Sequence, residues 1–184
     1  MLTCTLRRLE TLLDSAGFTA AQRVATDARN AKAEREKLQG EIAVLQKQKT
    51  DGGDGALSAA LDEKKNNLWN LDEKITALCR MEVARLAIHT ANASKETYKT
   101  CEIMVQAWEA LDSVDASIRS MGAPKANKAY HSKNKTAYTK TYNEKMSELN
   151  GVVSAAQVEL CRKEFATTVQ PLGVPAMINY LWPS

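Results

Sequence analysis

The sequence contains few residues that interrupt helices. Among 184 residues there are 8 Gly and 4 Pro, which is well below the average combined share of about 12%. All four Pro lie at or beyond position 124, so before that position only a few glycines oppose a continuous helix. Hydrophobic residues at 44% and charged residues at 26% are ordinary globular values. The composition therefore excludes collagen, wholesale disorder and a disulfide-stapled miniprotein.

Residues that commonly carry catalysis are also scarce. The chain has two His, His89 and His131, and neither belongs to a serine elbow, a His-Glu-x-x-His motif or a Glu-x-x-His pair. No glycine-rich phosphate-binding loop is present. Aromatic residues at 5% disfavour a deep aromatic-lined pocket. We therefore expect that the protein is not an enzyme and holds no cofactor; an enzyme would need a polar cavity into which Arg80, Glu82, Arg85 or His89 converge.

Metal-binding and export signals are lacking as well. Cys4, Cys79, Cys101 and Cys161 form no Cys-x-x-Cys pair, so a zinc site would need four distant segments to converge. We expect no metal site, and buried reduced thiols in an intracellular protein. The N-terminus has no apolar run typical of a secretory signal, and no stretch approaches the about 20 apolar residues of a membrane span.

Residues 1–16 are predicted to form a first amphipathic helix that ends at Gly17. Its leucines, Leu2, Leu6, Leu9 and Leu13, repeat at spacings of 4, 3 and 4 and would line one face. An organellar presequence would use the same face. The predicted location is therefore the cytoplasm, with the interior of an organelle as the alternative.

Two long runs, residues 19–50 and 56–121, are predicted as helical arms on either side of a turn. Asp51 to Gly55 is a cluster of turn residues, and on both sides of it apolar residues alternate at spacings of three and four, which is the coiled-coil period. If the chain reverses near residue 53, the two seams pair without adjustment, and the sequence predicts an antiparallel helical hairpin. The expected pairs are Leu45 with Leu61, Leu38 with Leu68, Ala31 with Ile75 and Ala28 with Leu78, with Arg35 beside Leu71.

The rest of the chain is predicted to extend this hairpin into an elongated three- to four-helix bundle, all-α and forming a single domain over residues 1–184. Residues 56–121 form either one helix or two joined near residues 90–95. A basic linker is expected over 122–136, one heptad-bearing helix over 137–170 with Gly151 at a close helix contact, and a short apolar tail over 171–184. Trp69 and Trp108 are interpreted as core anchors rather than binding residues.

Charge is concentrated in one segment. Between Ala116 and Asn143 there is no acid but there are six Lys or Arg. The preferred interpretation is a solvated loop or a contact with an acidic protein partner. A mixture of lysines and rings can also contact phosphates and stack bases, whereas an anionic membrane surface is disfavoured because apolar residues are lacking. The candidate phosphate or acidic-partner residues are Lys125, Lys128, Lys133, Lys135, Lys140, Tyr138 and Tyr142.

The apolar tail is the second candidate surface. If exposed it would promote aggregation, so it either docks on its own chain or inserts into a neighbouring subunit. The leading hypothesis is a non-catalytic structural or assembly subunit, an adaptor or scaffold whose partners are other protein subunits, itself among them. The alternative is a helical, nucleoprotein-like nucleic-acid-binding protein that uses residues 125–142. The candidate partner-binding residues of the tail are Met177, Ile178, Tyr180, Leu181 and Trp182.

Overall fold

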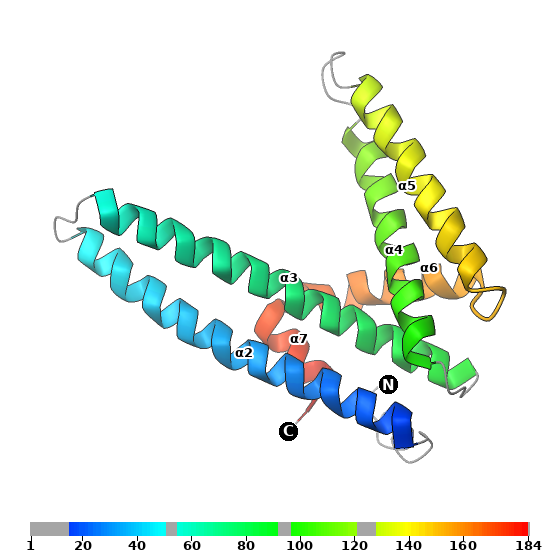
Figure 1. The fold of residues 1–184 in the computed structure, drawn as a ribbon, viewed down its shortest axis with the longest axis horizontal. Helices are drawn as coiled ribbons and strands as arrows, with labels where there is room; N and C mark the ends of the chain where they lie inside the picture. Colours follow the sequence, from blue (N-terminus) through cyan, green and yellow to red (C-terminus); the bar gives the residue numbers. More distant parts are fainter. Residues whose placement is uncertain (1–14, 51–54, 92–96, 121–127, 184) are drawn as a thin grey trace. The chain divides into compact units, whose positions relative to one another are not determined.

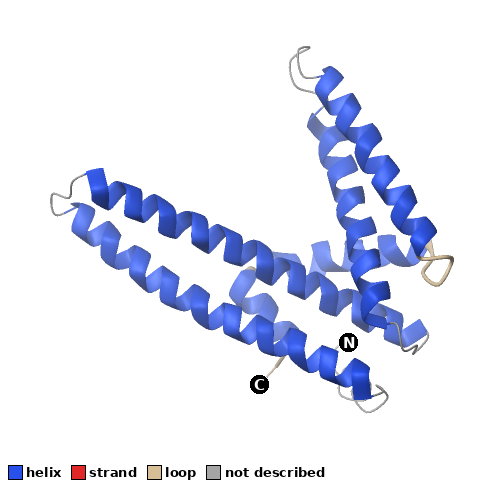
Figure 2. Cartoon of the chain, viewed as in Figure 1, coloured by secondary structure: helices blue, strands red, loops and turns tan. Residues whose placement is uncertain are grey.

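The computed structural model describes residues 15–50, 55–91, 97–120 and 128–183 (Figure 1). Over these ranges the chain forms α-helices with short turns and no strand (Figure 2), which confirms the predicted all-α class. The α-helices are α2 (Ser15–Thr50), α3 (Gly55–Ala91), α4 (Thr97–Ser120), α5 (Lys128–Glu148), α6 (Ala155–Glu164) and α7 (Val174–Leu181). A π-helical turn, Phe165–Val169, and a 3-10 turn, Gln170–Leu172, connect α6 to α7.

These helices belong to two compact units. The hairpin unit comprises residues 19–82 and the C-terminal part from 168, so it holds most of α2 and α3 together with α7. The α4–α6 unit comprises residues 83–167 and, of the described residues of α2, residues 15–18. The single domain and the three- to four-helix bundle stay predictions, and each unit is described by itself below.

In the hairpin unit, α2 and α3 lie side by side and run in opposite directions (Figure 1). Arg35 Nε lies 2.6 Å from Asp72 Oδ1, and Lys64 Nζ lies 2.7 Å from Glu41 Oε2. Both ion pairs lie within one residue of the pairing that the heptad pattern predicts, and the predicted turn at residues 51–54 lies outside the described residues. The buried seam consists of Ala28, Ala31, Leu38, Ile42, Leu61, Leu71 and Ile75.

In the α4–α6 unit, α4 and α5 lie side by side (Figure 1), with Cα atoms of the two helices within 8 Å of each other. The α4 side of the core contains Cys101, Met104 and Trp108, all less than 2% exposed. The Trp108 ring meets the Phe165 ring edge to face, with centroids 5.1 Å apart, a geometry that adds about 0.5–1.5 kcal/mol to the area buried. Trp108 is therefore a core residue, as the sequence indicates.

One predicted helix boundary is wrong, and the structure decides another that the sequence leaves open. Helix α2 begins at Ser15 and continues through Gly17, where the sequence analysis ends a helix. An interior Gly costs about 1 kcal/mol, and a helix of 36 residues has enough other hydrogen bonds to offset it. Between α3 and α4 the structure supports the two-helix alternative, because α3 ends at Ala91 and α4 begins at Thr97. Residues 1–14 of the first helix, which is predicted over residues 1–16, lie outside the described residues.

The predicted linker over residues 122–136 is too long. Residues 128–136 are the first part of α5, and only the part of the linker before 128 lies outside the described residues. Their sequence is polar and lacks the apolar periodicity from which a helix is predicted. Packing against α4 supplies the stabilisation that the sequence does not reveal, and His131 and Asn134 are half-buried.

The single helix predicted over residues 137–170 is also wrong. Helix α5 ends at Glu148, and Asn150 and Gly151 take left-handed backbone conformations with φ of 48° and 73°. Gly151 is therefore a turn residue, and a Cβ built on it meets nothing within 4 Å, so it makes no close helix contact. Helix α6 then starts with a capping box: Gln157 N donates to Ser154 Oγ at 3.2 Å, and Ser154 N donates to Gln157 Oε1 at 2.7 Å.

Candidate interaction surfaces

The apolar tail docks on its own chain. Most of it forms α7, in which Met177, Ile178 and Leu181 are at most 5% exposed, while Tyr180 and Trp182 are half-buried. Lys32 Nζ of α2 donates to Asn179 Oδ1 at 2.9 Å, which ties α7 to the hairpin. The sequence leaves two alternatives for the tail, docking on its own chain or insertion into a neighbouring subunit, and the structure supports docking on its own chain. An additional contact of these residues with another chain stays a prediction.

The basic segment is a helix with an exposed outer surface. Lys133, Lys135 and Lys140 are exposed, Tyr138 is 38% exposed and Tyr142 is half-buried. Of the other two predicted lysines, Lys125 lies outside the described residues, and of Lys128 only the backbone is described, as the first residue of α5. Lys140 lies 3.7 Å from Glu144 on the same helix, which neutralises part of its charge. The structure thus places most of the predicted residues on one helix, α5, together with an acidic residue, Glu144, that lies close to Lys140.

A groove of about 720 Å³, lined by residues of polar type, runs along α5. Two of the predicted lysines, Lys135 and Lys140, line it. The hydroxyls of Thr136 and Thr139 donate to carbonyls one turn earlier in the helix, at 3.1 and 2.8 Å, so their oxygens remain available only as acceptors. The remaining lining residues are Ser132, Asn143, Glu144 and Ser147.

An exposed indole is the feature that the sequence interpretation missed. Trp69 on α3 is 64% exposed, so its interpretation as a core anchor is wrong. The spacing explains the error, because Trp69 directly follows the seam residue Leu68, and one residue rotates a side chain by about 100° around a helix. Val44 on α2 is also exposed, at 57%. Tryptophan is enriched at the energetic centres of protein interfaces, so an exposed indole is a candidate contact residue.

A second groove, of about 470 Å³, lies between the two arms of the hairpin. The seam residues Leu38 and Leu71 contribute its apolar part. Its two acids, Glu34 and Glu41, come from α2, whereas α3 contributes only basic and amide groups. The polar residues around it are Glu34, Lys37 and Glu41 of α2 and Lys64, Asn67, Asn70 and Lys74 of α3. The sequence analysis did not identify this groove. The signal that could have located it is the presence of charged residues next to the seam residues Leu38 and Leu71.

The hydrogen bond between Glu41 and Lys64 affects how both groups titrate. It lowers the pKa of the Glu41 carboxyl below its ordinary value and raises the pKa of the Lys64 ammonium. Both side chains remain about one third exposed, so solvent screens the pair and its contribution to stability is small. The pair therefore shows which residues of α2 and α3 lie opposite each other, but it contributes little to stability.

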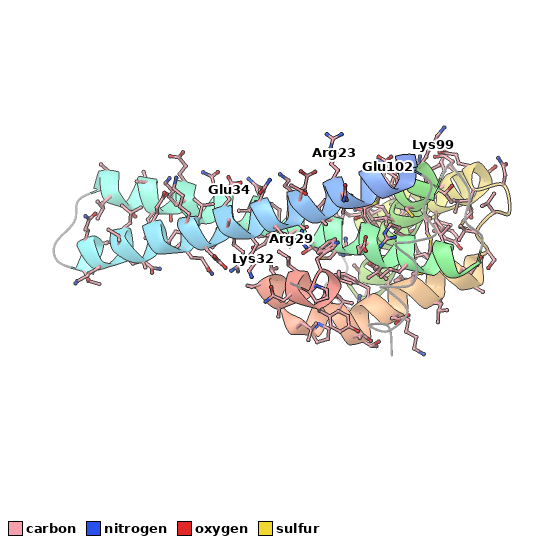
Figure 3. The ribbon with its side chains drawn as sticks, turned by 90° about the horizontal axis from the view of Figure 1, so that it is seen from below. Arg23, Arg29, Lys32, Glu34, Lys99 and Glu102 are labelled. Carbon is pink, nitrogen blue, oxygen red and sulfur yellow. The ribbon has the colours of Figure 1, made fainter. Side chains whose placement is uncertain are left out.

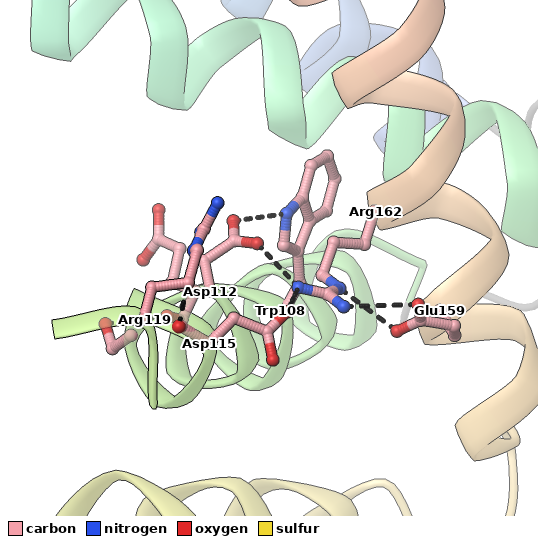
Figure 4. A network of polar contacts seen from close by, with 8 residues as sticks. Trp108, Asp112, Asp115, Arg119, Glu159 and Arg162 are labelled. Atoms are coloured by element: carbon pink, nitrogen blue, oxygen red, sulfur yellow. Dashed lines mark hydrogen bonds and ion pairs between the residues drawn. The ribbon is translucent and has the colours of Figure 1, made fainter. Parts of the chain in front are cut away.

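A guanidinium with several acidic partners fixes α6 on α4 (Figure 4). Arg162 Nη1 donates to Asp112 Oδ1 at 3.0 Å and to Asp115 Oδ2 at 2.5 Å, and Arg162 Nε donates to Glu159 Oε2 at 3.0 Å. These hydrogen bonds, first that to Glu159, raise the pKa of Arg162. Trp108 Nε1 donates to Asp112 Oδ2 at 2.9 Å and so connects the core to this network. The hydrogen-bonding groups of the Arg162 guanidinium thus find acidic partners within the chain, which is typical of a structural role.

The described thiols are buried. Cys79, Cys101 and Cys161 are free cysteines, and desolvation, with smaller contributions from Glu82 and Glu164, raises the pKa of Cys79 and of Cys161 to about 12. Thiols in this state are poor nucleophiles and poor metal ligands at neutral pH. Cys4 lies outside the described residues. Over the ranges that the structure describes, no group of three or more His, Cys, Asp or Glu side chains is arranged to hold a metal ion.

The charged residues that an enzyme would need to gather do not line either groove. Glu82 and Arg85 are buried, at 2% and 4% exposure, and Arg80 is half-buried; the side chain of His89 lies outside the description. The absence of catalytic activity stays a prediction. None of the helices in the described ranges combines the length and the apolar character that crossing a bilayer requires.

No family model matches the chain, and neither the curated proteins nor the solved structures give a match.

Proposed function

We propose that the protein is a non-catalytic assembly subunit or adaptor that binds other proteins through exposed helix surfaces. The observation that carries the proposal is the exposed indole of Trp69 on the α2–α3 hairpin. Tryptophan is among the residues most enriched at the energetic centres of protein interfaces, because its ring buries a large area at little cost in conformational entropy. A chain gains nothing in stability from leaving such a ring in water.

The hairpin suits this role because its arms are long and its seam is narrow. In the hairpin unit, α2 and the part of α3 up to about residue 80 pair through a narrow stripe of apolar residues, and many of their other side chains are exposed and available to partners. The coiled-coil geometry of this seam is part of the proposal. The tail, which was the predicted anchor, is largely used inside the chain, and the proposal therefore places the partner contact on the hairpin arms.

The test is recovery of bound proteins by the full-length tagged chain and by its Trp69→Ala variant, from the cells in which the protein naturally occurs. We expect that some proteins are recovered in fixed stoichiometry with the native chain. Their affinity for the Trp69→Ala variant should fall about tenfold or more if Trp69 is an interface hot spot of at least 1.4 kcal/mol, and their recovery should fall with it. Circular dichroism of both chains checks that helicity is unchanged.

Leu160→Ala is the matched control, since Leu160 is 63% exposed but belongs to α6, in the other unit. Equal recovery with the native chain and with Trp69→Ala would contradict the proposal. Equal loss with both variants would show that non-specific adhesion of apolar side chains explains the recovery, and this result would also count against it.

A second candidate function is nucleic-acid binding by α5. The observation that favours it is the groove along α5, where Lys135 and Lys140 lie among hydroxyl and amide groups, together with Tyr130, which is 66% exposed and available for stacking. Lys133 and Lys140 are seven residues apart and therefore share the outer side of the helix, about 10.5 Å apart along its axis. Glu144 in the same groove weakens this candidate.

Binding of a labelled single-stranded RNA or DNA at two salt concentrations tests it. Counterion release predicts that affinity falls steeply as salt rises, and that neutralising Lys133, Lys135 and Lys140 together reduces the salt slope by about 2, at roughly 0.7 per phosphate contact. Replacing Lys47 and Lys49 by Gln, at the end of α2, is the control for a general loss of positive charge. Binding that is independent of salt, or that is equally sensitive to the control, would dismiss this candidate.

A further inference from the structure

The two long sides of the hairpin differ in what they contact. On one side of α2, Lys32 bonds to α7, which covers part of the hairpin there. Figure 3 shows Arg23 and Glu34 on the other side of α2, away from Arg29 and Lys32. That other side carries the groove between the arms, and we call it the groove face: Glu34, Lys37 and Glu41 of α2, and Lys64, Asn67, Asn70 and Lys74 of α3. Trp69 lies about 200° around α3 from Asn67 and so is not part of it.

The charges of the groove face are divided between the arms. Its two acids, Glu34 and Glu41, belong to α2, and α3 contributes Lys64 and Lys74. Lys64 is paired with Glu41 inside the chain. Glu34 and Lys74 form no ion pair with any of the residues that the structure describes, and both are exposed. The face therefore presents one unmatched negative charge, Glu34 on α2, and two unmatched positive charges, Lys37 on α2 and Lys74 on α3.

Glu34 and Lys74 lie at nearly the same height along the hairpin. The Arg35–Asp72 ion pair fixes which residues of the antiparallel arms are level with each other. Glu34 is consequently level with residue 72 or 73 of α3, so Lys74 is displaced by no more than about 3 Å along the axis, at 1.5 Å per residue. A second hairpin placed on the groove face would meet both charges in one layer.

Symmetry decides how a second copy would fit. A twofold axis between two groove faces and parallel to the helices leaves the height of every residue unchanged and places α2 of one copy over α3 of the other. Glu34 of each chain then faces Lys74 of its partner, and Lys37 lies level with residue 69 or 70 of the opposite α3, where the groove holds the uncharged Asn70. A twofold axis perpendicular to the helices would instead place α3 on α3, whose two charges in the groove, Lys64 and Lys74, are both basic, and like-charge repulsion disfavours this arrangement.

We propose that the groove face is a homodimer interface, in which two hairpins pair face to face about a twofold axis along their length and the Glu34–Lys74 ion pair forms twice between chains. Leu38 and Leu71 line the groove but are already at most 9% exposed within one chain, so the pairing of charges, rather than newly covered apolar area, supports the proposal. The inference rests on the proposed function and names one of the partners as the chain itself.

The test uses the purified full chain and measures its dimerisation by sedimentation velocity over a range of concentrations. Glu34→Lys and Lys74→Glu are made separately. Each variant alone places like charges opposite each other at both symmetric contacts, and we expect the dissociation constant of its homodimer to rise by about 10- to 100-fold. Raising the salt to 1 M, where the Debye length is about 3 Å, should shrink that difference.

Mixing the two variants gives the decisive result. In a heterodimer the new lysine of one chain faces the new glutamate of the other, and the original Glu34 and Lys74 also face each other, so an equimolar mixture should dimerise about as well as the native chain. No contact within one chain explains that recovery. Glu36→Lys, which makes the same charge change at an exposed α2 residue outside the groove, is the control and should dimerise normally.

A native chain that stays monomeric at every concentration would overturn the inference, as would a dimer that neither single variant weakens, or a mixture that fails to recover. These outcomes are independent of the test of the proposed function. Loss of partners in Trp69→Ala concerns a different side of α3 and proteins other than the chain itself, so either result can stand when the other fails.

Discussion

The substitution Ile75→Ala tests whether the heptad seam holds the hairpin unit together. Ile75 on α3 is 0% exposed, so the substitution removes three buried carbon atoms from water-free surroundings. At about 0.8 kcal/mol per buried carbon the transfer contribution is about 2.4 kcal/mol. The cavity left between two long helices adds to this, because the helices cannot collapse locally, and the expected total is about 3–4 kcal/mol.

Urea unfolding followed by far-UV circular dichroism measures this loss. With a slope of about 2 kcal/mol per M, a loss of 3 kcal/mol moves the midpoint down by about 1.5 M. Val44→Ala is the matched control, since its side chain is 57% exposed on α2, and its effect should stay within about 0.5 kcal/mol. Equal midpoint shifts for the two variants would refute the reasoning, because the seam would then contribute no more than the surface does.

Two other predictions concern the arginine network and the buried thiols. Arg162→Met keeps most of the side-chain volume but removes the hydrogen bonds to α4, and it should cost about 1 kcal/mol by urea unfolding, since the acidic partners are 41–53% exposed and partly screened; no loss, or a loss of several kcal/mol, would contradict the geometry. The pKa of Cys79 and of Cys161 is raised to about 12, whereas thiols in the unfolded chain ionise near 8.5. The unfolded state therefore binds fewer protons between about pH 9 and pH 12, and the folded state should lose stability as pH rises, by up to about 1.4 kcal/mol per pH unit for each thiol. Cys79→Ala should flatten this dependence relative to the native chain in unfolding measured between pH 8 and pH 10, and an unchanged slope would contradict burial of the thiol.

Local patterns were sufficient where a long, regular stripe of apolar residues was present. The alternation of three and four along both arms predicts which residues are buried, and Leu38, Ile42, Leu71 and Ile75 are buried. The same reasoning failed for Trp69. The sequence pattern shows that Trp69 is next to the seam, but it does not show how wide the buried seam is. In a two-helix pairing only a narrow stripe is covered, so a ring one position away remains in water.

Patterns were insufficient where helices depend on their neighbours. Residues 128–136 carry no apolar periodicity, yet they are helical because α5 packs on α4. Conversely, the spacing of Leu149 and Val153 is typical of a helix that continues. The structure instead has a turn between them, at Asn150 and Gly151, which both have positive φ. Leu149 and Val153 are buried on either side of this turn. The capping box at Ser154 and Gln157 was the local signal that could have located this break.

The sequence by itself determined the all-α class and the residues that face inward along the hairpin, because these follow from backbone propensity and from a period that each helix carries alone. It also determined the shortage of catalytic groups. Only the tertiary structure decided that α7 uses the apolar tail inside the chain, that Trp69 is exposed, and that Glu34 and Lys74 lie level on one face. Each of these depends on residues distant in sequence being brought to the same height and side, which no local period encodes.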